Sequence, residues 1–390
     1  MEIPRFARND IEDAGAITYD VVCNNPRGVY LPAIIEGIRL MQHRERTLAA
    51  IRHQVPDRIP LDAICIENAE AVARELHLPV ESIYDRLGLD GRILNGGRYT
   101  GELPVRNGKT LSHWGTEDSN DYGSAHFYPL AEAASVAEVE HYAWPDADRF
   151  VFDGLQTTLQ NLTGEYALRG PYWASAPLFC TACNLMGMEE ALCKMLSDPE
   201  VFEACIEQVF RFSCRYVERF AAAAGPRLDI LYLADDFASQ RGLMMDPVLW
   251  RKMLKPRYAK LFALGKRRGL PIWFHSCGDI TAVLPDLLEI GLDVWETVQL
   301  HSLPMTPQQL KKEYGRHITF FGAVNTQQLP FQKPNEVADE VRRCMDALGE
   351  GGGYICGPDH HIKGDVPVDN VLALFNTAQD YRRIGYTATV

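Results

Sequence analysis

LPIWFHSCG, residues 270–278, belongs to a series of short apolar runs that recur through the second half of the sequence. Segments with the apolar spacing of helices lie between these runs, so the chain alternates strand and helix. The other runs are LDILYLADD (228–236), LDVWETV (292–298), HITFFGAV (317–324) and GGYICGPDH (352–360). Near-continuous apolar strands separated by helices predict a parallel sheet covered on both faces. A (β/α)8 TIM barrel is the favoured architecture, and a doubly wound open sheet is the alternative.

Polar side chains gather where the predicted strands end. Barrel enzymes build their active sites from the loops that follow the carboxyl ends of the strands, so this clustering predicts a site. The residues concerned are Asp235, Asp236, His275, Cys277, Glu296, Gln299, Asn325, Cys356, Asp359 and His360.

The centre of the predicted site is the pair His275 and Cys277. Positions i and i+2 of an extended chain point to the same face, so the imidazole and the thiol converge while Ser276 faces away. Zinc needs at least three protein ligands, and Cys356 in the last apolar run is the expected third. One histidine and two thiolates favour zinc over magnesium or calcium and leave a fourth position open. The alternative is a core histidine beside two cysteines that serve only in packing.

A second cysteine pair, Cys180 and Cys183 in FCTAC, forms a C-x-x-C motif. Such a motif can be a redox pair or half of a zinc site. No second C-x-x-C completes a structural zinc site, so we favour a helix start whose two thiols pack inward. Most of the ten cysteines are expected to act as small buried hydrophobes.

Three residues are candidates for catalysis. Asp235 and Asp236 could act as general base, hydrogen-bond a ligand or orient a metal-bound histidine, or they could simply end a strand. His360 and His361 follow a Pro-Asp turn, and we take His360 as the one that lines the pocket.

The candidate substrate-binding residues form a polar and an apolar set. Gln240, Gln299 and Asn325 are neutral groups able to hydrogen-bond a substrate. An apolar wall for an aromatic ring could be formed by residues that could equally fill the barrel core: Trp173, Phe179, Met186, Met244 and Trp295.

Composition limits the class of protein. The 390 residues are 46% hydrophobic and 23% charged, which is ordinary for a soluble globular enzyme. A formal net charge of −13 argues against a nucleic-acid surface or an anionic membrane as partner. The start, MEIPRFARND, has no apolar signal core, and no long apolar span follows, so we expect a cytoplasmic protein. We divide the chain into an N-terminal extension, 1–40, and a catalytic barrel, 41–390.

Several segments together resemble the uroporphyrinogen decarboxylase superfamily over roughly residues 42–385. They are PDRIP (56–60), ADDFASQRGLMMDP (234–247), WFHSCGDI (273–280), FFGAVNTQQLP (320–330) and GGYICGPDHHIKGDVPVDNV (352–371). Within them, H-x-C followed by a distant cysteine is similar to the zinc site of the corrinoid-linked methyltransferases of that superfamily. The resemblance implies a (β/α)8 barrel with His275, Cys277 and Cys356 as zinc ligands. The arginine-rich loop with which true uroporphyrinogen decarboxylases hold their substrate has no counterpart.

These observations predict a zinc-dependent methyltransferase. We expect it to move a methyl group from an O-methyl donor, in particular an aryl methyl ether, to Co(I) of cobalamin on a corrinoid carrier protein. One alternative is the methylation of a thiol by a methylcorrinoid. Others are a decarboxylase or lyase of the same superfamily and a non-enzymatic zinc- or corrinoid-binding protein. Residues 1–40 could cap the barrel or a homodimer.

Overall fold

The computed structural model describes residues 34–35, 38–117, 127–162, 164–172 and 177–381. The chain divides into two compact units, Met1–Leu40 and Met41–Val390. In the first unit the described residues form an antiparallel pair, β1 (Ile34–Ile35) and β2 (Ile38–Arg39). Most of residues 1–40 lie outside the described ranges, so their expected role as a cap stays a prediction. The second unit carries the sheet and the candidate site.

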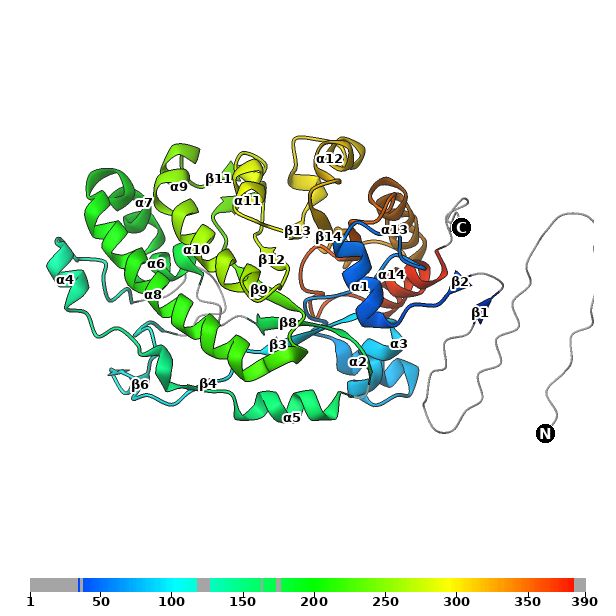
Figure 1. Ribbon diagram of the computed structural model, residues 1–390, viewed down its shortest axis with the longest axis horizontal. Coiled ribbons are helices and arrows are strands. Elements are labelled where there is room, and N and C mark those ends of the chain that lie inside the picture. The colour runs from blue at the N-terminus through cyan, green and yellow to red at the C-terminus, as the bar shows by residue number, and fades with distance from the viewer. Residues whose placement is uncertain (1–33, 36–37, 118–126, 163, 173–176, 382–390) are drawn as a thin grey trace, which may run out of the picture. The chain divides into compact units, whose positions relative to one another are not determined.

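A curved parallel sheet forms the centre of the second unit (Figure 1). It has seven strands in the order β15-β14-β13-β12-β9-β8-β3. The five apolar runs predicted as strands supply the last five in sequence. The strands are β3 (Gly91–Asn95), β8 (Ala167–Tyr172), β9 (Ile230–Ala234), β12 (Ile272–His275), β13 (Val294–Val298), β14 (Thr319–Val324) and β15 (Tyr354–Pro358).

The two edges of this sheet are joined by the segment 60–66. Leu61 forms a parallel bridge to Cys356 of β15. On its other side, the carbonyl of Leu61 accepts the N–H of Asp90, which directly precedes β3, at 2.7 Å. This segment therefore takes the eighth strand position, and the ring of parallel strands closes. The (β/α)8 barrel predicted from the sequence is confirmed.

Helices cover the outside of the barrel. In many of them a proline occupies the first turn, where no backbone N–H is required. The helices are α1 (His43–Ile51), α2 (Ala69–Leu76), α3 (Ile83–Arg86), α4 (Val136–Glu140), α5 (Asp153–Asn161), α6 (Leu178–Met186), α7 (Met188–Ser197), α8 (Pro199–Ala224), α9 (Pro247–Met253), α10 (Lys255–Lys266), α11 (Leu284–Glu289), α12 (Pro307–Tyr314), α13 (Pro334–Leu348) and α14 (Val368–Asp380). None of the helices in the described ranges has the length and apolar character needed to cross a membrane.

Strand residues alternate between two buried cores. The larger core lies between sheet and helices and includes Ile272 and Phe274 of β12. A smaller core inside the barrel includes Trp273 of the same strand, together with Leu48 and Ile51 of α1. Because both faces of each strand are buried, the apolar runs are continuous, as expected for a parallel sheet.

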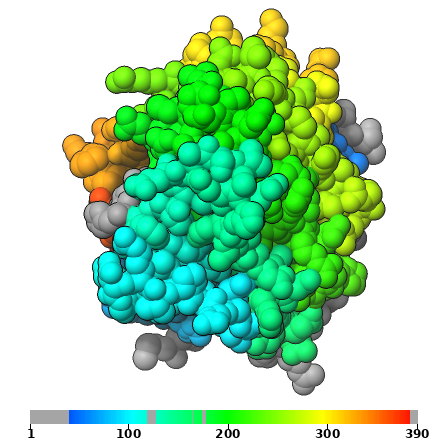
Figure 2. All heavy atoms as spheres, turned by 90° about the vertical axis from the view of Figure 1, so that its left-hand side faces the viewer, coloured from blue at the N-terminus to red at the C-terminus, as the bar shows by residue number. Residues whose placement is uncertain are grey.

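The long connection between β3 and β8 packs on α8. It contains α4, α5 and two short antiparallel pairs, β4 (Arg98–Tyr99) with β7 (Phe150–Val151) and β5 (Val105–Arg106) with β6 (Lys109–Thr110). Phe150 meets Phe212 and Tyr216 of α8 edge-on, with ring centroids 6.0 and 4.8 Å apart. In Figure 2, the cyan to blue-green atoms of this connection cover the lower part of the visible face.

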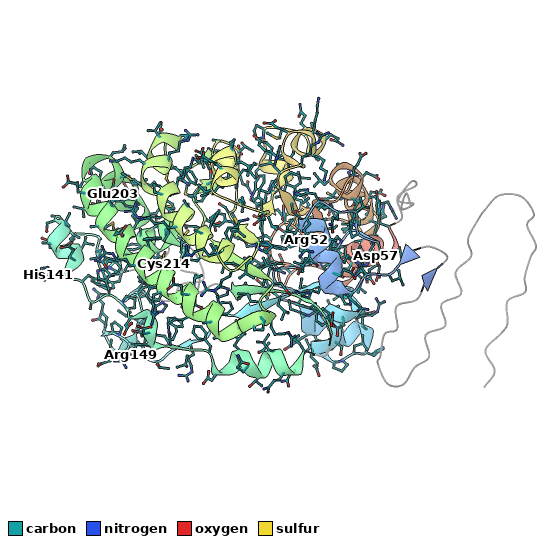
Figure 3. All side chains as sticks on the ribbon, viewed as in Figure 1. Arg52, Asp57, His141, Arg149, Glu203 and Cys214 are labelled. Atoms are coloured by element: carbon teal, nitrogen blue, oxygen red, sulfur yellow. The ribbon has the colours of Figure 1, made fainter. Side chains whose placement is uncertain are left out.

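The end of the barrel where the strands begin holds a buried charge cluster around Asp90, whose side chain is fully buried. Its carboxylate accepts hydrogen bonds from His43, Arg46 and Arg58. Arg46 also pairs with Asp57, which Figure 3 labels beside α1. Burial alone would raise the pKa of Asp90, but these cationic neighbours, Arg58 first, lower it to about 2. Asp57 and Arg58 of the PDRIP motif thus serve the structure.

We predict that Asp90→Asn lowers the free energy of unfolding by about 3–5 kcal/mol, because it leaves the buried guanidinium of Arg46 and the partly buried guanidinium of Arg58 without their shared anion. Asp153→Asn is the control, since Asp153 and its partner Arg98 are 73% and 66% exposed; its effect should stay below about 1 kcal/mol. Urea unfolding followed by tryptophan fluorescence measures both. Since the folded pKa of Asp90 is lowered, the difference should persist above pH 3.8 and shrink as the pH falls toward 2. Equal stability of the two variants would contradict the proposed role of Asp90.

Candidate metal centre

Two predicted ligands meet at the end of β12. His275 is the last residue of the strand, and Cys277 follows two positions later. The Nε2 atom of His275 lies 3.5 Å from Sγ of Cys277. Two such donors bound to one tetrahedral zinc at normal bond lengths lie about 3.5 Å apart. The spacing of the pair therefore suits a shared metal ion.

The third donor of the cluster is His360. It lies just beyond Pro358, the last residue of β15, and the centroid of its ring is 5.6 Å from that of the His275 ring. One ligand atom from each of His275, Cys277 and His360 can be chosen so that all lie within 4.8 Å of one another. We expected His360 to be catalytic; its position allows it to be a ligand.

Cys356 does not join this cluster. In β15, Ile355 belongs to the core inside the barrel, whereas Tyr354 and Cys356 belong to the core under the helices. The thiol of Cys356 accordingly lies near Tyr354 and Cys344 of α13. Strand alternation turns it away from the barrel axis. Among the described residues, His360 and not Cys356 therefore lies beside His275 and Cys277, and which of the two binds a metal stays a prediction.

A buried carboxylate orients His275. Glu296 of β13 is fully buried, and its Oε1 lies 2.7 Å from Nδ1 of His275. Glu296 also accepts hydrogen bonds from the hydroxyl of Tyr232 (2.7 Å) and from Nε1–H of Trp273 (2.5 Å). With Nδ1 bonded to Glu296, Nε2 is the nitrogen that faces Cys277. Carboxylates commonly support metal-binding histidines in this way.

The sequence analysis placed Glu296 among the polar residues at the strand ends but gave it no specific role. The available signal was a single charged residue inside the otherwise apolar run LDVWETV. A charge at such a position is costly unless it is paired, so it indicated a buried partner.

The loop that carries Cys277 is held by two predicted site residues. Asp236 accepts the N–H of Cys277 at 2.7 Å, and its carboxylate lies 3.8 Å from Nε2 of His275. Gln299 accepts the N–H of Gly278 at 2.9 Å. Gly278 has φ +81°, and a Cβ there would lie 2.4 Å from the carbonyl oxygen of Ser239. Glycine is therefore required for the tight turn that presents the thiol.

The electrostatics of the cluster favour a cation. Burial opposes the charged form of His275, but Cys277, Glu296 and Asp236 together raise its pKa well above the ordinary value. Burial, followed by the influence of His275 and His361, lowers the pKa of His360 to about 3. A neutral His360 keeps a lone pair available for a metal.

Asp235 has a structural role. Its carboxylate accepts the N–H groups of Phe179 (2.7 Å) and Cys180 (2.9 Å) in the first turn of α6, as well as the hydroxyl of Tyr258. Burial raises the pKa of Asp235 to about 6. Cys180 and Cys183 are buried in the same helix, where burial raises the pKa of both thiols. This arrangement agrees with a helix start whose thiols pack inward.

The remaining predicted substrate residues are mostly structural in the described part of the chain. Phe179, Met186 and Trp295 are fully buried in the core under the helices, and Met244 is partly buried against it. These four do not form a wall around the cluster. Trp173 lies outside the described residues.

Two polar candidates lie in loops at the mouth. Asn325 accepts the N–H of Gln327 through its side chain, at 2.9 Å. The exposed Gln240 lies between β10 (Ala238–Ser239) and β11 (Gly242–Leu243), with Nε2 3.4 Å from Nε2 of His301. Among the described residues, the side-chain hydrogen bonds of Asn325 and Gln240 go to Gln327 and His301 and not to the cluster, and a substrate role for both stays a prediction.

Comparison with known proteins agrees with this fold. Residues 123–381 match the family described as uroporphyrinogen decarboxylase (URO-D). A Methanosarcina mazei protein, methylated-thiol–coenzyme M methyltransferase, is 24% identical over 203 residues, 52% of this chain and 51% of that protein. The chain thus spans about half the length of this curated relative. The solved structure of a methyltransferase from Methanosarcina mazei has a TM-score of 0.63 at 16% identity, covering 87% of this chain and 98% of the other. That likeness shows the shared fold.

The family match spans most of the barrel, from the connection before β8 to the end of α14, and includes all three residues of the cluster. The closed barrel and the comparisons lead to the same assignment. The chain belongs to the uroporphyrinogen decarboxylase family.

Proposed function

We propose that this protein is a zinc-dependent methyltransferase that exchanges a methyl group between a small methylated compound and the cobalt of a corrinoid carrier protein. The cluster of His275, Cys277 and His360 is the observation that carries the proposal. Two imidazoles and a thiolate are a ligand set that suits zinc and leaves a fourth position for a substrate. The methyltransferase name of the sequence relative supports the reaction class.

We further propose that the methyl group comes from an O-methyl donor, in particular an aryl methyl ether. The cobalt(I) electron pair forms the new Co–C bond, the C–O bond breaks, and the departing oxygen keeps its electron pair until it takes a proton from solvent. When bound, zinc supplies Lewis acidity, and a site with one thiolate leaves the ion a net charge of +1 to offset the charge on that oxygen. Cys277 is the single thiolate in the cluster.

The surrounding residues fix the geometry of the cluster. Glu296 holds Nδ1 of His275, and Asp236 holds the backbone of Cys277, so both residues are oriented before a ligand arrives. The carboxylate of Asp236 lies 3.8 Å from Nε2 of His275, so it borders the cluster. Preorganised donors of this kind avoid a reorganisation cost during the reaction.

A second candidate is the reverse direction, in which a thiol accepts the methyl group from a methylcorrinoid. The name of the Methanosarcina mazei relative, a methylated-thiol–coenzyme M methyltransferase, favours it. In this case Cys277, His275 and His360 would present the metal that keeps the accepting thiol ionised.

We predict that the purified protein binds about one zinc ion and that Cys277→Ala and His360→Ala abolish this binding. Two matched controls are available, since Cys356 is a second buried thiol and His361 is the neighbouring imidazole. Cys356→Ala and His361→Ala should keep full zinc occupancy, as measured by elemental analysis after dialysis. If Cys356→Ala empties the site while His360→Ala leaves it full, Cys356 is the third ligand and the cluster is misassigned.

We predict that the protein converts cob(I)alamin to methylcob(III)alamin when supplied with a methoxyaromatic compound under anaerobic conditions. The cobalt absorption spectrum follows the reaction, with methanol, methylamines and methyl thioethers as comparison donors. Cys277→Ala should abolish turnover. Methylation of a thiol by methylcobalamin, without methylation of cobalt by any donor, would reverse the proposed direction.

We predict that uroporphyrinogen is not decarboxylated, because the sequence has no counterpart of the arginine-rich loop that holds its carboxylates. Incubation with uroporphyrinogen and chromatographic analysis for coproporphyrinogen tests this. Zinc-independent formation of coproporphyrinogen would instead assign the decarboxylase reaction to this member of the family.

A further inference from the structure

The candidate metal centre stands above a column of buried polar side chains inside the barrel. Arg169 of β8 and Asp62 of the closing segment are 1% and 2% exposed and form an ion pair. Barrel interiors are usually filled by branched apolar side chains. Burial of charged groups costs several kcal/mol per ion even when they are paired, so this column is not explained by stability alone.

An indole ring connects the ion pair to the metal centre. The guanidinium carbon of Arg169 lies 4.5 Å from the ring centroid of Trp273, in the geometry of a cation–π contact. On the edge of the same ring, Nε1–H donates to Oε2 of Glu296 at 2.5 Å. The other oxygen of Glu296 holds Nδ1 of His275. Arg169 thus fixes the indole, the indole fixes the carboxylate, and the carboxylate fixes the histidine.

We propose that Trp273 is a positioning residue of the metal centre, with Arg169 holding its ring in place. Its Nε1–H sets the rotation of the Glu296 carboxylate and, through it, the direction in which Nε2 of His275 points. This inference rests on the metal site of the proposed function. Trp273 itself reaches no ligand atom, so it acts through Glu296.

The chain provides a matched control in Trp295. Both tryptophans are 0% exposed, and they lie in adjacent strands, where Phe274 pairs with Trp295. Trp295 faces the core under the helices, and its Nε1–H has no hydrogen-bond partner among the described residues. Replacement by phenylalanine removes a similar volume from a buried site in both cases, but only at Trp273 does it remove a hydrogen bond to Glu296.

The experiment compares Trp273→Phe with Trp295→Phe in the full chain. Zinc affinity is measured by competition with a chromophoric chelator, and ligand geometry by the d–d absorption of the Co(II)-substituted protein. Loss of an outer hydrogen bond of this type weakens metal binding about 10- to 100-fold. We expect that loss and an altered cobalt spectrum for Trp273→Phe, with wild-type values for Trp295→Phe. Thermal unfolding of both variants separates this effect from a general loss of stability.

Tyr232→Phe is a second variant, in case Trp273→Phe fails to fold, because it removes the second donor from outside the cluster that supports Glu296 and keeps the ring. It should also weaken zinc binding and change the cobalt spectrum. If the folded Trp273→Phe protein has wild-type zinc affinity and a wild-type cobalt spectrum, the positioning role is overturned and the metal site stays intact. Where only Tyr232→Phe folds, the same result for that variant has the same meaning. Failure of the wild-type protein to bind zinc at all would overturn the metal site and this inference together.

Discussion

The arrangement of the candidate site depends on the closure of the parallel sheet by residues 60–66. Because Leu61 bridges to Cys356 and its carbonyl accepts the N–H of Asp90, every strand position has two neighbours and all strands run in one direction. The carboxyl ends of the strands therefore meet at one mouth. Residues far apart in the sequence, such as His275 and His360, come together there without any local signal that relates them.

The two ends of the barrel use buried charge differently. At the end where the strands begin, Asp90 accepts hydrogen bonds from His43, Arg46 and Arg58. These bonds join α1 and the segment before the closing strand to the sheet. Toward the mouth, Glu296 gathers Tyr232, Trp273 and His275, and the last of these presents its second nitrogen to Cys277. The polar groups of the first cluster bond one another, whereas in the second cluster Nε2 of His275 remains available to a ligand.

Much of the fold and part of the site could be predicted from the sequence. The apolar runs identified five of the strands, and the i, i+2 rule brought His275 and Cys277 together, because both features are local. The third donor could not be found in this way. Ile355 faces the inside of the barrel, so strand alternation turns the next residue, Cys356, toward the helices, and the strand ends at Pro358, before His360. The apolar wall could not be predicted for a related reason. Strands buried on both faces show no alternation of apolar and polar residues, so the sequence does not reveal that Trp273 faces the inside of the barrel and Trp295 the helices.

The three residues of the cluster lie in different kinds of local structure. His275 belongs to a central strand and Cys277 to a turn fixed by Asp236 and Gln299, whereas His360 lies in the loop after the last strand. A change at position 360 therefore need not disturb the barrel. Histidine there contributes no charge to a bound ion, and cysteine would contribute one negative charge. A single exchange in a loop would thus shift the net charge of a zinc complex from +1 to 0, so that one unchanged scaffold can carry either a stronger electrophile or a site that favours an electron-rich sulfur.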